Sequence, residues 1–130
     1  MTRAYLDSSA FVKLVSLEPE SAALRADLVP WSNLASSALL AAEVLRAAVR
    51  AGPQAVADAR ALLAGVELIG VDQPLLEASA FLPPPDLRTI DAIHLSAALS
   101  IRSDLGAFFV YDLRLANAAR GHGLPVRSPT

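Results

Sequence analysis

Hydrophobic and polar positions define two kinds of segment along the chain. Short apolar runs of the kind that form buried strands are separated by longer segments with apolar residues at helical spacing. The strand-like runs are residues 3–6, 31–35, 66–71 and 107–111. The helical segments are residues 9–15, 18–28, 37–51, 53–63, 72–81, 89–101 and 113–120. This rhythm predicts an α/β fold of three layers, an α/β/α sandwich with helices on both faces of a mainly parallel central sheet.

Capping and turn residues predict several of the boundaries. Ser8 or Ser9 is expected to cap the first helix, because a serine side chain accepts a hydrogen bond from the first turn. Gly52 and Pro53 separate the third helix from the fourth. The run of residues 83–85 is three prolines, which predicts a loop between helices and is too short for an interdomain linker. We therefore expect residues 1–130 to form a single domain.

The composition restricts the class of protein. Hydrophobic residues make up 54% of the 130 residues and charged residues 18%, which favours a compact fold over disorder. Charged residues such as Glu43 and Asp91 interrupt the longest apolar stretches, well short of the ~20 apolar residues that a membrane span requires. Asp7 lies where a signal peptide would need apolar residues. A cytoplasmic protein is expected, and the absence of cysteine leaves only oxygen or imidazole ligands for a metal.

The charge balance argues against a protein that coats nucleic acid with a broad basic face. The formal net charge is −2 and the pI is about 5.6. Eleven cationic residues remain available, of which ten are arginines. If several acids are gathered in one pocket and neutralised by divalent cations, the remaining surface becomes relatively positive.

Four acidic residues differ from the others because apolar residues surround them in the sequence: Asp7, Glu43, Asp91 and Asp112. Asp7 and Asp112 follow predicted strands, and the carboxyl ends of parallel strands meet at one edge of a sheet. Acids carried by neighbouring helices can join them there. Mg²⁺ or Mn²⁺ would relieve the repulsion between these carboxylates, and it would activate a water for phosphodiester hydrolysis.

Each of these acids also has a structural alternative. A buried carboxylate can pair with an arginine, and Arg46, Arg88 and Arg114 lie nearby in the sequence. Asp91 and Asp112 lie near predicted helix starts, where an acid can cap the helix. For a single acid the structural interpretation is the better one, and only the joint pattern favours a metal site.

Four sequence blocks surround these acids in order along nearly the whole chain: residues 5–14, 42–48, 87–95 and 110–119. In these blocks the chain resembles a PIN-domain ribonuclease of the VapC-like toxin type. The resemblance implies that Asp7, Glu43 and Asp91 are the core metal-binding acids. It also implies that Asp112 is the fourth acid, binding directly or through water, and that Ser9 helps to hold the first.

The resemblance extends to substrate and partners. It implies an RNA substrate, cleaved internally with Mg²⁺ or Mn²⁺ as cofactor by a toxin of a toxin–antitoxin pair. It further implies a homodimer formed through the early helices, and an antitoxin protein whose peptide covers the cleft and inserts an arginine among the acids.

The chain departs from the family pattern at Val110, where many relatives carry threonine or serine. Loss of this hydroxyl would loosen the surroundings of Asp112. We expect it to affect the occupancy of a second metal more than activity itself. A catalytically degenerate PIN fold that binds RNA or protein is the alternative, and retention of all four acids argues against it. A signalling receiver would need adjacent acids after the first strand and a lysine near the last. Asp7 is followed by two serines, and the sole lysine is Lys13.

Basic residues near the acids are candidates for RNA contacts. Arg46 and Arg50 follow Glu43 by one and two helical turns, and they either reach RNA phosphates or solvate the helix. Lys13 and Arg114 are grouped with them.

The histidines and the larger aromatic residues favour structural roles. His94 lies one turn after Asp91, which allows a metal role, but a packed structural histidine is favoured. His122, between two glycines, is expected in a surface turn, and Tyr5 and Trp31 in the core rather than stacked on bases.

Overall fold

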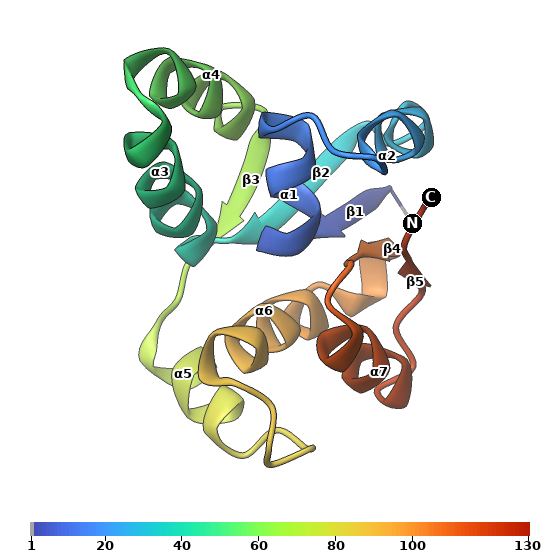
Figure 1. The fold of residues 1–130 in the computed structure, drawn as a ribbon. Coiled ribbons are helices and arrows are strands. Elements are labelled where there is room, and N and C mark those ends of the chain that lie inside the picture. Colours follow the sequence, from blue (N-terminus) through green and yellow to red (C-terminus); the bar gives the residue numbers. More distant parts are fainter. Residues whose placement is uncertain (1) are drawn as a thin grey trace.

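The structure is a computed structural model that describes residues 2–130 and is built around one five-stranded sheet (Figure 1). The strands are β1 (Arg3–Leu6), β2 (Asn33–Ser37), β3 (Val66–Ile69), β4 (Leu105–Phe109) and β5 (Val126–Arg127). The α-helices are α1 (Ser8–Val15), α2 (Ser21–Leu28), α3 (Leu39–Ala51), α4 (Pro53–Leu63), α5 (Gln73–Ala80), α6 (Thr89–Ser100) and α7 (Leu113–Gly121). The strand order is β3-β2-β1-β4-β5 and every neighbouring pair is parallel.

Alternation along the central strands divides the core between the two faces of the sheet. On β1, Ala4 and Leu6 face the layer of α1 to α4, while Tyr5 faces the layer of α5 to α7. On β4, Phe109 and Phe108 follow the same alternation. Figure 1 shows the two helical layers on opposite sides of the sheet, so the three-layer α/β/α prediction is confirmed. No helix among residues 2–130 is long and apolar enough to cross a membrane.

Several predicted boundaries were wrong by a few residues. The first helix is capped by Asp7 rather than by Ser8 or Ser9, since the Asp7 side chain accepts from the backbone N–H of Ala10. Residue 37 ends β2 instead of opening α3. β4 ends at Phe109, so Asp112 follows it after a short connection. The prediction also omitted β5, which has two residues and too short a pattern to detect.

The two central strands bring distant parts of the chain to one edge of the sheet. Leu6 of β1 is in register with Phe109 of β4. The backbone N–H of Asp7 then donates to the carbonyl of Phe109 at 3.2 Å, which extends the pairing beyond β1. On its other side β1 pairs with β2, which leads into α3. The carboxyl edge of the sheet is therefore where side chains from the start, the middle and the end of the chain meet.

Candidate functional site

One cavity at the carboxyl edge of the sheet is lined by all four acids that the sequence singled out. Its volume is about 290 Å³ and its lining residues are Asp7, Ser8, Ser9, Val12, Glu43, Arg88, Asp91 and Asp112. Asp7 caps α1 and Asp112 caps α7. Glu43 lies in the second turn of α3, and Asp91 in the first turn of α6. The fold thus brings together acids from four separate segments.

Asp7 is a buried carboxylate held by neutral donors. It is 1% exposed, and the Ser9 hydroxyl lies 2.7 and 2.8 Å from its two oxygens. The backbone N–H of Ala10 donates to Oδ1 at 3.0 Å. Burial raises the pKa of Asp7 to about 6, because it outweighs the opposing effect of these hydrogen bonds. A bound cation would stabilise the ionised form of such a buried acid.

Ser9 connects the segment of the first acid to the segment of the fourth. Besides donating to Asp7, its hydroxyl oxygen accepts from the backbone N–H of Tyr111 at 2.9 Å and of Asp112 at 3.2 Å. One donor and two lone pairs are all that a serine hydroxyl offers. The single hydroxyl of Ser9 therefore holds both the carboxylate of Asp7 and the backbone that carries Asp112.

Arg88 lies between the two remaining aspartates at the mouth of the cavity. Its Nε donates to Asp91 Oδ2 at 2.8 Å and its Nη2 to Asp112 Oδ2 at 3.3 Å. Asp112 uses its other oxygen, Oδ1, to accept from the backbone N–H of Leu115 at 3.0 Å, which caps α7. The sequence indicated Arg88 only as an ion-pair partner, whereas the structure also places it in the lining of the cavity. Its spacing of three residues from Asp91 was the available signal.

Glu43 reaches the cavity from α3, in the layer of α1 to α4, and contacts a buried histidine of α6 in the other helical layer. Nε2 of His94 lies 2.8 Å from Glu43 Oε1, and the hydroxyl of Tyr5 lies 2.7 Å from His94 Nδ1. His94 and Tyr5 are both fully buried, as a structural histidine and a core tyrosine are expected to be. The contact between His94 and Glu43 joins α6 to α3, and helix periodicity gave no sign of it.

The donor set of the cavity fits a hard divalent cation. Its acids offer carboxylate oxygens, which Mg²⁺ and Mn²⁺ prefer, and it provides no sulfur ligand. As the side chains lie, no three acidic or histidine residues within the described chain are close enough to hold one ion together. An ion shared by three acids therefore requires side-chain rotation and outward movement of Arg88. The guanidinium side chain of Arg88 is 66% exposed, so it is free to move outward.

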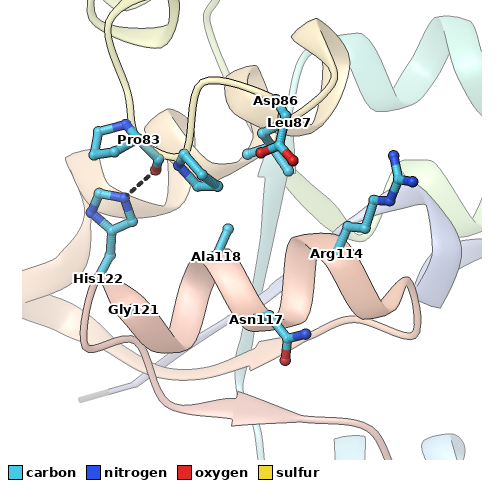
Figure 2. A pocket seen from close by; sticks show the side chains of 9 residues that line it. Pro83, Asp86, Leu87, Arg114, Asn117, Ala118, Gly121 and His122 are labelled. Atoms are coloured by element: carbon cyan, nitrogen blue, oxygen red, sulfur yellow. Dashed lines mark hydrogen bonds between the residues drawn. The ribbon is translucent and has the colours of Figure 1, made fainter.

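The arginines expected to contact RNA lie on exposed surfaces. Arg46 and Arg50 are exposed on α3 and Arg114 is exposed on α7. Arg114 also lines a second cavity of about 560 Å³ between the segment 83–87 and α7. Figure 2 shows this cavity with Arg114 extending beyond it on one side. Leu87, which lines it, immediately precedes Arg88, so the two cavities are neighbours.

Lys13 is in a different position from these arginines. It is 8% exposed, and its ammonium group lies 3.1 Å from a carboxylate oxygen of Glu18 and 3.2 Å from one of Glu20. The same group lies over the ring of Tyr111, 4.7 Å from its centroid. These contacts already offset its charge and raise its pKa against the effect of desolvation.

The other residues that the sequence singled out occupy structural positions. Trp31 packs against the core beneath α1 to α4, and Val110 is fully buried in the core on the other face. His122 ends α7, and its Nε2 lies 2.8 Å from the carbonyl oxygen of Pro83. The side chain of Val110 offers no hydroxyl, and the hydroxyl of Ser9 accepts from the backbone N–H of Asp112.

The fold and the acidic cavity are those of a PIN domain, and the chain belongs to that family, whose model matches residues 4–121. Ribonuclease VapC46 of Mycobacterium tuberculosis is 45% identical over 130 residues, covering all of both chains. Ribonuclease VapC47 of the same species is 38% identical over 96% of each chain. Within the PIN-domain family, this chain belongs to the VapC ribonucleases.

A solved structure supports the assignment of the fold. A chain of a toxin–antitoxin complex from Klebsiella pneumoniae superposes with a TM-score of 0.77 over 98% of each chain. Its sequence identity is 23%, so this likeness concerns the fold alone.

Proposed function

We propose that this chain is a Mg²⁺- or Mn²⁺-dependent endoribonuclease that acts as the toxin of a toxin–antitoxin pair. The observation that carries the proposal is that Asp7, Glu43, Asp91 and Asp112 line one cavity. Membership of the VapC ribonucleases supports RNA as the substrate, and clustered carboxylates support hydrolysis of its phosphodiester bonds.

The residues of the cavity divide into ligands and supports. Asp7, Glu43 and Asp91 would hold the cation, with Asp112 as a fourth ligand, directly or through water. When bound, such a cation lowers the pKa of a water and offsets charge on the leaving oxygen. Ser9 keeps the carboxylate of Asp7 oriented through its 2.7 Å hydrogen bond.

The geometry around Asp112 bears on how many cations are bound. Val110 is buried in the apolar core and offers no hydroxyl to the fourth acid, and Oδ1 of Asp112 is already used to cap α7. We therefore propose one firmly held cation, with any second ion held more weakly.

Exposed arginines would position the RNA. Arg46, Arg50 and Arg114 form no hydrogen bond or ion pair with another described residue, so their guanidinium groups are available to phosphate oxygens. Arg88 would join them once a cation displaces it from the aspartates. Lys13 is the weakest of the candidates, because two carboxylates already bind it. Single-stranded or looped RNA is the proposed form of substrate, since a cleft reaches its backbone most easily.

An antitoxin would inhibit the enzyme by covering the cavity. Arg88 demonstrates that a guanidinium fits between Asp91 and Asp112, so an arginine of a partner peptide would fit there as well. Ile90 is 47% exposed and Leu113 is 76% exposed, each next to one of these acids, and they offer apolar contacts to such a peptide. The Klebsiella pneumoniae chain comes from a complex of this kind.

We further propose that residues 1–130 form one nuclease domain that assembles as a homodimer in the cytoplasm. Leu17 and Val29 flank α2 and are 87% and 82% exposed, so their side chains are available for contact with a second copy of the chain. Their place agrees with a dimer interface on the early helices.

The decisive experiment is cleavage of a mixed cellular RNA pool by the purified protein with Mg²⁺ or Mn²⁺. Asp7→Asn and Asp91→Asn remove two proposed ligands, and EDTA removes the cation. Asp58→Asn is the matched control, because Asp58 is an exposed acid on α4 that accepts from Gln54 at 2.9 Å. We expect discrete fragments from the wild type and Asp58→Asn, and none from the other samples. Equal products from every protein, or none from folded wild type with metal, would favour a non-catalytic RNA- or protein-binding domain.

A further inference from the structure

A buried chain of hydrogen bonds runs from the centre of the sheet to one acid of the cavity. It begins at the hydroxyl of Tyr5 on β1, passes through both ring nitrogens of His94 on α6, and ends at Oε1 of Glu43 on α3. Its two distances are 2.7 and 2.8 Å, and both Tyr5 and His94 are inaccessible to solvent. The chain therefore connects three elements through groups that water does not reach.

The chemistry of the three groups determines which atom carries each proton. An ionised carboxylate only accepts, so Nε2 of His94 carries the proton that points at Glu43. In the neutral ring Nδ1 is then an acceptor, and Tyr5 donates its hydroxyl proton to it. Burial keeps Tyr5 protonated, since it raises the pKa of the phenol well above its ordinary value. One tautomer of His94 satisfies every group.

Packing fixes the two rings as firmly as the hydrogen bonds do. Tyr5 stacks on Phe108 of β4, with ring centroids 5.3 Å apart and planes 8° apart. Its edge meets the ring of His94 at 84°, with centroids 5.9 Å apart. Because neighbouring aromatic rings hold both side chains, Nε2 of His94 is presented in one direction.

Glu43 is the acid of the cavity that needs such a donor most. Asp7 and Asp112 begin helices and accept backbone N–H groups there, and Asp91 is held by Arg88. Glu43 lies inside α3, where the backbone N–H groups are used by the helix. His94 is the donor within hydrogen-bonding distance of its carboxylate among residues 2–130.

We propose that His94 is a positioning residue that orients the carboxylate of Glu43 through Nε2, with Tyr5 selecting the tautomer of the ring. Oε1 is held by the histidine, which leaves Oε2 for a cation. The inference rests on the proposed metal-dependent function of the cavity. His94 then does more than pack in the core. Its hydrogen bond restricts the side-chain torsions of Glu43 before the ion binds.

Two substitutions of His94 separate this task from packing. His94→Gln keeps an N–H at the distance of Nε2, while His94→Asn keeps one only at the distance of Nδ1 and cannot reach Glu43. Both replace the ring by an amide, and Asn, which is one methylene shorter than Gln, leaves the larger void. Thermal unfolding establishes that each variant is folded before binding is measured.

The measurement is the affinity for Mn²⁺ without RNA, obtained from the free-ion signal in electron paramagnetic resonance. We expect His94→Asn to weaken Mn²⁺ binding by about 10- to 100-fold and His94→Gln to recover most of the loss. Tyr5→Phe, which keeps the stacking on Phe108, is expected to have a smaller effect. In the metal-free wild type, the ¹⁵N spectrum is expected to show His94 protonated at Nε2.

Three results would overturn the role of His94: wild-type affinity in folded His94→Asn, equal weakening in both His94 variants, or a ring protonated at Nδ1. A wild type that binds Mn²⁺ but cleaves no RNA would count against the proposed function alone. A wild type that binds no Mn²⁺ would overturn both.

Discussion

At the scale of single residues, Asp7 and Asp112 each combine a helix cap with carboxylate lone pairs that can still bind a cation. Asp112 caps α7 through Oδ1, and its Oδ2 accepts from Arg88. Asp7 caps α1 while both its oxygens contact Ser9. The structural interpretation of these acids and the functional one are therefore compatible, because a carboxylate has two oxygens. Sequence alone presents the two interpretations as rivals.

Burial of Asp7 predicts a stabilising substitution in the metal-free protein. The pKa of Asp7 is about 6 in the folded chain against 3.8 for an ordinary aspartate, so between these pH values the folded state binds more protons. Stability therefore falls as pH rises from about 4 to about 6, and the ionised group remains unfavourable at neutral pH. We expect Asp7→Asn to raise the free energy of unfolding by about 1–3 kcal/mol at pH 7. Urea unfolding in EDTA measures it.

The same experiment at low pH is the internal control. Well below the ordinary pKa of 3.8, the carboxyl group of Asp7 is neutral in both the folded and the unfolded chain, so the advantage of Asp7→Asn disappears. An advantage that stayed constant from pH 3 to pH 7 would exclude ionisation of Asp7 as its cause.

Removal of the Ser9 hydroxyl is expected to lower the free energy of unfolding. Ser9→Ala leaves the backbone N–H groups of Tyr111 and Asp112 without their acceptor and deprives Asp7 of a donor. We expect a cost of about 1–3 kcal/mol in the free energy of unfolding. Ser8→Ala, on the same turn and in the same cavity, is expected to change it little. Equal effects of the two substitutions would contradict the connecting role of Ser9.

At the scale of elements, apolar periodicity located each of the seven α-helices among residues 2–130, and local capping signals misplaced some of their ends. Ser8 and Ser9 are good capping residues, yet the chain leaves β1 so directly that Asp7 caps α1. Ser37 remains in β2 because that strand pairs with β3 as far as Ile69. Strand pairing between distant segments sets these ends, and a local sequence pattern carries no information about that pairing.

Gly52 predicts the cost of a side chain at the junction of α3 and α4. Its φ is +120° and ψ is 174°, a conformation that is strained for residues with a Cβ. We expect Gly52→Ala to lower the free energy of unfolding by about 1–3 kcal/mol, measured by thermal denaturation. Gly70→Ala is the control, because Gly70 also has open space around it but no positive φ. A loss of stability at Gly70 as large as at Gly52 would contradict a conformational cause.

At the scale of the whole molecule, the sequence indicated the four acids and the support of Asp7 by Ser9, but not the contacts that Arg88 and His94 make with the other acids. Strand ends and apolar surroundings were enough to single out Asp7 and Asp112. The contacts of Arg88 with Asp112 and of His94 with Glu43 join residues 24 and 51 positions apart. Such contacts depend on how helices pack across the sheet, and neither helical spacing nor composition encodes that directly.

The exposed apolar side chains on the early helices predict a dimer that charge would disrupt. We expect wild type to sediment as a dimer and the double variant Leu17→Glu, Val29→Glu as a monomer, because two charges would be buried in the interface. Phe81→Glu is the control, since Phe81 is 82% exposed in the other helical layer and should leave the dimer intact. Sedimentation velocity distinguishes the species. A dimer that survives the double substitution would place the interface elsewhere.

The position of β1 in the middle of the sheet matters while the ribosome is still making the chain. β1 emerges first, yet its neighbour β4 comes from the last quarter of the sequence, and Asp112 follows β4. A nascent chain that ends before β4 has only three of the four acids, and β1 lacks one of its two partners. The full set of carboxylates is thus assembled only after β4 and Asp112 have been made, so a partly made chain holds the first three acids without the fourth.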